Sequence, residues 1–251
     1  MISLQNVGVR RNSKTILQNI NIEIQAKNHL AVIGPNGAGK SFLLRIMSAD
    51  IIPSSGDVTI LGKTFGKTNL WELRKKIGFV SSQLIFWYGG STTVMEVVGS
   101  GFNGTLGLPN DLNTREKEQV FKILRSFKME SFIDRVFKTL SDGEKRKVLL
   151  ARALVWSPEI VIFDEPCMGL DIPTREFFLQ DIEALSKNIL VIYVTHHLEE
   201  LPTCIKQVLY LKNGTVWNSG PKEKMLTSQF ISEVFAYDLK VIAKQGKYYL
   251  Q

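Results

Sequence analysis

Cysteine and histidine are scarce in this chain of 251 residues, which contains two cysteines and three histidines. Cys167 and Cys204 stand far apart, with no CxxC pair and no Cys/His cluster at zinc spacing. We therefore expect two reduced, structural thiols and neither a disulfide framework nor a zinc site.

Long apolar runs are also absent. No segment approaches the roughly 20 apolar residues that span a bilayer, and the longest runs, residues 160–163 and 189–194, are the size of strands. The N-terminus lacks a basic region followed by an apolar stretch, so we expect no secretory signal. These absences predict a cytoplasmic protein without a membrane span of its own.

The composition is that of an ordinary globular protein, with 44% hydrophobic and 22% charged residues. The net charge is +7, which is compatible with nucleic acid, with an anionic membrane surface or with nucleotide ligands. Charge alone does not choose among these partners.

The most informative stretch is a glycine-rich loop between an apolar strand (residues 30–33) and the start of a helix (residues 42–47). It fits the phosphate-binding pattern G-x-x-x-x-G-K-[ST], in which backbone N–H groups and a helix N-terminus surround phosphate. Lys40 would reach the β- and γ-phosphates, and the Ser41 hydroxyl would hold Mg²⁺. The predicted nucleotide-binding residues here are Gly34, Pro35, Asn36, Gly37, Ala38, Gly39, Lys40, Ser41 and Phe42.

The hydrophobic pattern changes along the chain. Period-two alternation at residues 2–7 and 20–24 predicts antiparallel strands, whereas strand signals disappear between about 84 and 157. There, helical periodicity follows a capping-box pattern at Asn113 and Glu116, and residues 99–107 form a glycine-rich connection or short helical turns. We interpret 84–157 as an inserted helical subdomain.

Strand and helix patterns alternate before and after that insertion. We expect strands at 57–61, 77–81, 159–164, 189–195 and 207–211, and helices at 70–76 and 174–186. Such alternation implies parallel strands with crossover helices. The tail (about 226–251) predicts a helix near 229–235 and strands at 239–242 and 247–250. The predicted fold class is α/β: a P-loop NTPase core with a mainly parallel sheet, an N-terminal antiparallel β subdomain and the helical insertion, all within one domain, 1–251.

Two carboxylates end the apolar strand at residues 160–163. Ligands of parallel sheets bind at the carboxyl ends of strands, so Asp164 is placed to bind Mg²⁺ and Glu165 to accept a proton from water. Two charges that merely cap a buried strand are the simpler alternative.

The segment Leu140-Ser141-Asp142-Gly143-Glu144 opens another helix. Its simplest interpretation is a capping box between Ser141 and Glu144. The alternative is a second anion site at a helix N-terminus. That second site makes sense if two chains close over shared nucleotide.

The order of these motifs resembles the ATP-binding subunit of ABC transporters over essentially the whole chain. Residues 34–41 resemble Walker A and 161–165 Walker B, with Glu165 at the catalytic position. Residues 140–144 resemble the LSGGQ signature. Residues 169–171 match the D-loop. Gln83 matches the Q-loop, and His196 matches the switch histidine better than His197 does.

This resemblance implies ATP and Mg²⁺ as ligands, with Ser41, Gln83 and Asp164 at the metal and Glu165 as general base. It also implies catalytic roles for Lys40, Gln83 and His196. It further implies a head-to-tail homodimer or a pairing with a second ABC subunit. There, Ser141, Gly143 and Glu144 face the partner's nucleotide and Asp171 contacts the partner. Taken singly, Gln83 could be a loop amide and His196 a core residue.

Some positions depart from the family pattern. Asp142 and Glu144 replace a glycine and the glutamine of the signature, and a carboxylate at Asp142 would repel a γ-phosphate. Arg11 stands where many relatives have an aromatic residue that stacks on adenine. A guanidinium can stack on a base, although an exposed turn residue is nearly as good an interpretation.

The sequence therefore predicts an ATP-hydrolysing subunit that is peripheral on the inner face of the cell membrane. It would power transport through separate transmembrane permease subunits, docked near residues 84–87. Residues 70–82, 99–107 and 195–200 resemble the ModF-like branch, which suggests molybdate or a metal chelate as cargo. The alternative is a soluble ABC-type ATPase that acts on nucleic acid, on ribosomes or in regulation. We expect no nucleic acid, because the chain carries a single set of motifs.

Overall fold

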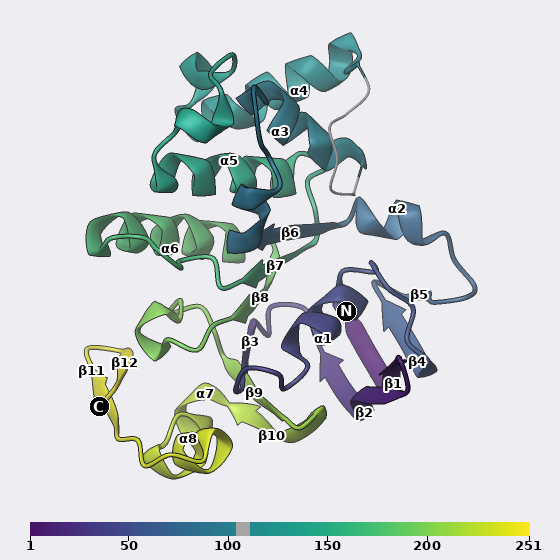
Figure 1. Ribbon diagram of the computed structural model, residues 1–251, viewed down its shortest axis with the longest axis vertical. Helices are drawn as coiled ribbons and strands as arrows, with labels where there is room; N and C mark the ends of the chain where they lie inside the picture. Colours follow the sequence, from purple (N-terminus) through teal and green to yellow (C-terminus); the bar gives the residue numbers. More distant parts are fainter. Residues whose placement is uncertain (104–110) are drawn as a thin grey trace.

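The computed structural model describes residues 1–103 and 111–251 (Figure 1). Its strands are β1 (Ile2–Arg11), β2 (Lys14–Ile24), β3 (Leu30–Ile33), β4 (Ser55–Ile60), β5 (Lys63–Thr64), β6 (Ile77–Ser81), β7 (Ile160–Asp164), β8 (Leu190–Val194), β9 (Gln207–Lys212), β10 (Thr215–Pro221), β11 (Val241–Lys244) and β12 (Lys247–Leu250). Its α-helices are α1 (Lys40–Met47), α2 (Leu70–Arg74), α3 (Val94–Gly99), α4 (Thr114–Ser126), α5 (Asp142–Leu154), α6 (Ile172–Ser186), α7 (Lys222–Met225) and α8 (Ser228–Phe235).

A six-stranded sheet forms the centre, in the order β10-β9-β3-β8-β7-β6. All neighbours in it are parallel except β10, which runs antiparallel to β9. Strand β7 is buried on both faces, since Ile160 and Ile162 face one hydrophobic cluster while Val161 and Phe163 face the other. A strand buried on both sides explains why its sequence is a continuous apolar run rather than an alternating one.

A second sheet, in the order β2-β1-β4-β5, is antiparallel throughout. Helix α1 lies between this sheet and the central one, and its Leu43, Leu44 and Ile46 are fully buried in the cluster that the two sheets share. The helix that follows the glycine-rich loop is thereby held from both sides.

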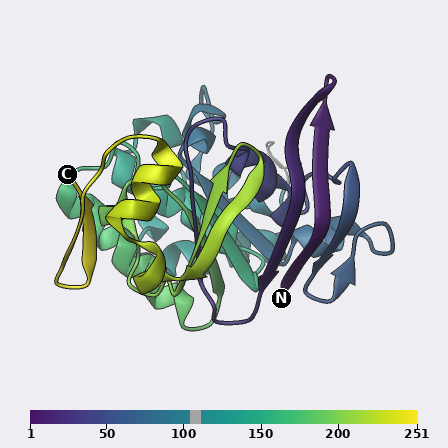
Figure 2. The same ribbon diagram turned by 90° about the horizontal axis from the view of Figure 1, so that it is seen from below.

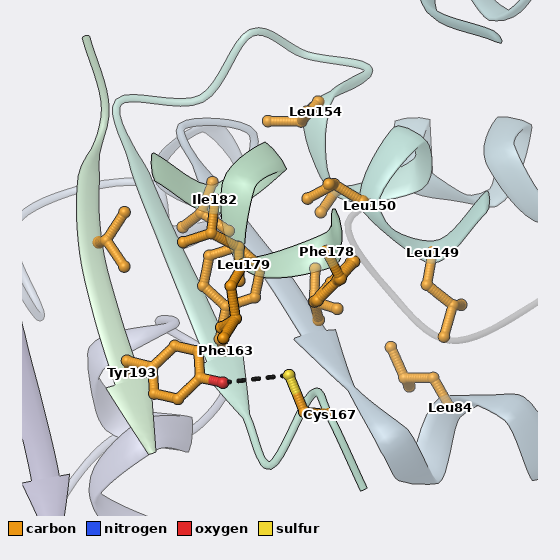
Figure 3. Close-up of a cluster of buried hydrophobic side chains, with 14 of the residues drawn as sticks. Leu84, Leu149, Leu150, Leu154, Phe163, Cys167, Phe178, Leu179, Ile182 and Tyr193 are labelled. Atoms are coloured by element: carbon orange, nitrogen blue, oxygen red, sulfur yellow. Dashed lines mark hydrogen bonds between the residues drawn. The ribbon is translucent and has the colours of Figure 1, made fainter. Parts of the chain in front are cut away.

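The other face of the central sheet is covered by α5 and α6 (Figure 3). Phe178, Leu179 and Ile182 of α6 pack over Phe163 and Tyr193 of the sheet, and the rings of Phe163 and Phe178 meet edge to face with centroids 6.3 Å apart. Helices α3 and α4 lie beyond α5 (Figure 1). The described part of 84–157 contains α-helices, short 3₁₀ helices and one isolated bridge, Thr93 to Val136.

The chain ends in α8 and the β11–β12 hairpin, on the side of the molecule away from the antiparallel sheet (Figure 2). Lys247 of the hairpin pairs with Glu176 of α6 at 2.5 Å. Within residues 1–103 and 111–251, no helix combines the length and apolar character needed to cross a membrane.

The structure confirms the predicted fold class, and most expected elements agree within a few residues. The expected strand 77–81 is β6 without any shift, and both capping boxes, Asn113 with Glu116 and Ser141 with Glu144, are present. Strand β10 was not predicted. Of the expected glycine-rich connection 99–107, residues up to 103 end α3 and form a 3₁₀ turn, and 104–107 lie outside the described residues.

Candidate active site

The glycine-rich loop leads from β3 directly into α1. Gly39 occupies the N-cap of α1 at φ 100°, and no side chain caps this helix. A Cβ on Gly39 would lie 2.6 Å from Leu17 Cδ2, so both the backbone angle and the close approach of β2 favour glycine here. The first N–H groups of α1 are therefore left for an anion.

Lys40, the first residue of α1, folds back over its own loop. Its Nζ donates hydrogen bonds to the carbonyl oxygens of Gly34 at 2.6 Å and Pro35 at 3.0 Å. Burial lowers the pKa of Lys40, while the nearby charges of Glu165 and Asp164 oppose that shift. The ammonium group is thus held at the loop, beside the two carboxylates of β7.

A cavity of about 510 Å³ opens in front of the loop. The lining residues that the sequence predicted are Asn36, Gly37, Gly39, Lys40, Ser41, Phe42, Gln83, Asp164 and Glu165. Gly34, Pro35 and Ala38 do not line it; Gly34 and Ala38 are buried behind the loop, and the Gly34 and Pro35 carbonyls hold Lys40.

Asp164 ends β7 at the floor of this cavity. Burial, together with the neighbouring charge of Glu165, raises its pKa from 3.8 to about 6, against the opposing effect of Lys40. A bound cation would favour the ionised form of this carboxylate. Ser41 and Gln83 bring two more oxygen ligands to the same cavity. Mg²⁺ prefers hard oxygen ligands of this kind, so the donor set fits the metal.

Glu165 adopts φ 46°, a left-handed conformation that is uncommon for glutamate. Its N–H donates to the carbonyl of Val194 on β8 at 2.9 Å, which stabilises the turn. The side chains of Glu165 and Asp164 both line the cavity, and Glu165 has His196 as a further partner.

His196, just after β8, meets Glu165 across the sheet edge. Its Nδ1 lies 3.0 Å from Glu165 Oε1, within hydrogen-bonding distance. His197 points to another partner: its Nδ1 lies 3.6 Å from Glu199 Oε1, and its ring is tilted by 42° against the ring of His196, with centroids 4.1 Å apart. Of the two histidines, His196 is therefore the one whose ring nitrogen lies beside Glu165.

The N-terminus of α5 lies outside the cavity. Ser141 caps the helix, since its Oγ accepts from Glu144 N at 3.3 Å while Glu144 Oε2 accepts from Ser141 N at 2.7 Å and from its Oγ at 2.8 Å. The hydrogen bonds from Ser141 lower the pKa of Glu144. Gly143 packs so closely on α6 that a Cβ there would lie 2.5 Å from Thr174 Cγ2.

Three other predicted residues do not line the cavity either: His196, which contacts Glu165 beside it, and also Asp171 and Arg11. Asp171 caps α6, where its Oδ1 accepts from Thr174 N at 2.9 Å, and these contacts lower the pKa of Asp171. Arg11 is exposed at the end of β1, paired in register with Lys14, and does not line the cavity.

Sequence reasoning missed Ile16, Ser81 and Ser82 as lining residues. The two serines stand at the carboxyl end of β6, next to β7, and that position was the available signal. Ile16 offered no local signal, because it belongs to a strand of the other sheet.

A second cavity, of about 440 Å³, adjoins the first and shares Ser41, Ser81, Gln83 and Asp164 with it. Trp87 and Trp156 line it, and Lys75 Nζ sits 5.0 Å from the Trp156 ring centroid. Arg45, Arg74 and Arg152 also line it, against the carboxylates of Asp50 and Asp164. Gln83 thus stands at the junction of a polar cavity and a basic, aromatic groove.

Comparison with known proteins places these features in a family. The ABC transporter family model matches residues 17–168. The chain is 37% identical over its full length to the uncharacterized ABC transporter ATP-binding protein YlmA of Bacillus subtilis, covering 96% of that protein. The chain is also 35% identical to the ABC transporter ATP-binding protein ModF of Escherichia coli. That alignment covers 81% of this chain and 43% of ModF.

Solved structures agree with these sequence relatives. The dimeric structure of the bacterial ABC transporter cassette MJ0796 superposes with a TM-score of 0.74 at 27% identity, over 88% of this chain and 98% of that one. A second dimeric structure of MJ0796, in a post-hydrolysis state with ADP and Pi bound, matches equally well.

Proposed function

This chain belongs to the family of ABC transporter ATP-binding proteins, and from that premise we propose how its residues bind and hydrolyse ATP and couple hydrolysis to transport. The observation that carries the proposal is the single cavity in which Lys40 and Ser41 of the loop face Asp164 and Glu165 of β7. This arrangement of phosphate-binding residue types and a candidate base around one cavity supports a γ-phosphate site there.

In the proposed complex, the phosphates lie along the loop, against the uncapped N-terminus of α1. Lys40 would exchange its two carbonyl partners for the β- and γ-phosphates, since charge-assisted bonds to phosphate are the stronger ones. Ser41, Gln83 and Asp164 would hold Mg²⁺, which neutralises charge on the phosphates when bound. Ile16 and Phe42 offer apolar contacts beside the loop, whereas Arg11, the proposed partner of the adenine ring, does not line the cavity.

Glu165 is the proposed general base. It accepts a proton from the attacking water, whose oxygen bonds to the γ-phosphorus as the bond to the bridging oxygen breaks and ADP leaves. The Nδ1 of His196 lies 3.0 Å from Oε1 of Glu165, which itself lines the cavity. His196 would orient the carboxylate and contact the γ-phosphate as charge develops.

A second copy, or a second ABC subunit, would complete each site. Ser141, Gly143 and Glu144 stand outside the chain's own cavity, which fits the proposal that they face the nucleotide of the partner, with Asp171 at the contact between the two. Exposed apolar side chains near the D-loop support this surface: Met168 is 47% exposed and Ile172 68%.

The groove beside Gln83 is the proposed docking site for transmembrane permease subunits. Phe86 and Trp87 are 81% and 67% exposed, a large apolar surface for a monomer, while Leu84 is buried and Ile85 half-buried. The arginines and lysine of the groove favour a docking segment that carries carboxylates. Docking on the permease at this groove would hold the chain at the inner face of the membrane.

We further propose that residues 1–251 act as one ATPase domain, with 84–157 as its helical subdomain and 226–251 as an extension. The ModF-like resemblance supports molybdate or a metal chelate as cargo, although cargo is selected largely by the membrane partner.

The test is a pull-down from the membrane fraction with the Glu165→Gln variant in the presence of ATP. Removal of a general base lowers turnover by about 10²- to 10⁴-fold and should retain ATP in a closed dimer together with a multi-span membrane protein. The matched control is Glu159→Gln, which changes an exposed glutamate just before β7. This variant should hydrolyse ATP like the wild type. Recovery of ribosomes or nucleic acid without a membrane protein would favour the soluble alternative. Undiminished turnover by Glu165→Gln would reject the assigned base.

A further inference from the structure

Arg146 is a buried arginine in the second turn of α5, five residues beyond Ser141. It is only 2% exposed, and its Nη2 donates to the carbonyl oxygen of Met168 at 2.6 Å. Its Nε and Nη1 have no hydrogen-bond partner among the described residues. Burying a guanidinium with so few partners is costly, so its single strong bond calls for an explanation.

The bond is made to the turn that carries Glu165. Met168 N donates to the Glu165 carbonyl at 3.3 Å and Leu170 N to the Cys167 carbonyl at 3.1 Å, so residues 165–170 form two successive tight turns. The body of the protein holds these turns at three points. One is Glu165 N on Val194, another is Cys167 Sγ against Tyr193 Oη at 3.4 Å (Figure 3), and the third is Arg146 on Met168.

The first two anchors come from strand β8, within the central sheet. Arg146 comes instead from α5, the helix whose N-terminus carries Ser141 and Gly143. The first turn of α5 is also packed tightly on α6 at Thr174, just beyond the turns. Through these contacts a displacement of α5 would reach the Glu165 turn, rather than being absorbed by a loose loop.

We propose that Arg146 is a positioning residue, which locks the turn that carries Glu165 to the helix that begins at Ser141. This inference rests on the proposed role of Glu165 as general base. Arg146 does not line the cavity, and its hydrogen bond is to the backbone of Met168, so it acts on hydrolysis through the backbone of the turn. ATP binding at Lys40 and Ser41 does not depend on it.

The kinetic test compares Arg146→Met with Arg146→Lys in the full chain. Methionine fills the space without a donor, so we expect kcat for ATP to fall about tenfold while KM stays within about twofold; lysine keeps one donor and should retain more of the rate. Because Arg146→Met also removes a buried charge with unpaired nitrogens, the melting temperature should change by less than about 4 °C. A kcat equal to that of the wild type overturns the proposal. So does a general defect, in which the melting temperature and kcat both fall and KM rises.

Cys167 provides a direct readout of the turn. Burial raises the pKa of this thiol to about 12, so it should react slowly with a thiol reagent such as DTNB. The experiment uses a Cys204→Ser background, in which Cys167 is the one remaining cysteine. Loss of the Arg146 anchor should raise the labelling rate at least threefold in Arg146→Met, with an intermediate rate in Arg146→Lys. Equal rates in all three proteins contradict the proposed lock.

Glu165→Gln in the same ATPase assay separates the two proposals. If Glu165→Gln abolishes turnover and Arg146→Met does not slow it, the positioning role alone is wrong. If Glu165→Gln turns over like the wild type, the assignment of the base fails first, and the labelling rates still decide whether Arg146 holds the turn.

Discussion

Two helix N-termini of this protein, those of α1 and α5, are both expected to face phosphate, yet they are built in opposite ways. Helix α1 begins at a left-handed glycine with no side-chain cap and no acidic residue in its first turn. Helix α5 begins with a complete capping box and two acidic residues, Asp142 and Glu144. The first helix leaves its N–H groups and Lys40 for a ligand, whereas the second satisfies them internally.

The difference indicates how each site uses its ligand. An uncapped helix with a lysine binds phosphate as a property of the isolated chain. A capped, acidic helix is stable without ligand, because its carboxylates complement the helix dipole. It can add to nucleotide binding only when a partner brings phosphate close enough to compete with Glu144. On the proposed function, the site at α1 would bind nucleotide in the isolated chain, whereas the site at α5 would depend on assembly.

The largest expected effect is at α1. Lys40→Met should lower ATP hydrolysis by about 10²- to 10³-fold, as the loss of one preorganised donor does elsewhere. Folding should be retained, because the partners of Lys40 in the free protein are two backbone carbonyls. Lys145→Met is the matched control in the first turn of α5, where the lysine pairs with Asp142 at 3.2 Å. Steady-state ATPase assays decide; equal losses in both variants would remove the distinction between the helices.

The two sites should also respond to pH in opposite directions. The pKa of Asp164 is raised, so the protein without ligand loses stability as pH rises from about 4 through about 6, by up to about 3 kcal/mol. Asp164→Asn should abolish that loss. The pKa of Glu144 is lowered, so its contribution is present above its ordinary pKa and is lost as pH falls through the lower value.

Urea denaturation of wild type, Asp164→Asn and Glu144→Gln across pH 3 to 8, without Mg²⁺ or nucleotide, measures both trends. If stability varied with pH in the same way in all three proteins, the electrostatic contrast between the cavity at Asp164 and the start of α5 at Glu144 would not hold.

The smallest expected effect concerns Asp142. Its side chain is 62% exposed and turned to Lys145, so its repulsion of a partner's nucleotide is partly screened. Asp142→Asn, made in the Glu165→Gln background, should strengthen ATP-dependent dimerisation by up to about fivefold at low salt, and the gain should shrink at high salt. Sedimentation at several chain concentrations measures it. Weaker dimers would mean that Asp142 supports the contact between subunits.

Local patterns predicted most of the elements. The apolar run at 160–163, the alternation at 20–24 and the two capping boxes each depend on neighbours within a few residues, so the sequence alone reveals them. Strand β10 escaped because Asn218, Gly220 and Pro221 are typical turn residues. It is a strand because it pairs with the edge of β9, a contact that no local pattern contains.

Within the candidate site, the sequence by itself determined the glycine-rich loop, the paired carboxylates and the start of α5, since each is a short contiguous motif. Only the tertiary structure decided that His196 lies within hydrogen-bonding distance of Glu165, that Ile16 and not Arg11 lines the cavity, and that Arg146 reaches Met168. Those contacts join segments that are distant along the chain. They follow from the register of parallel strands and from helix packing, which depend on the whole fold at once.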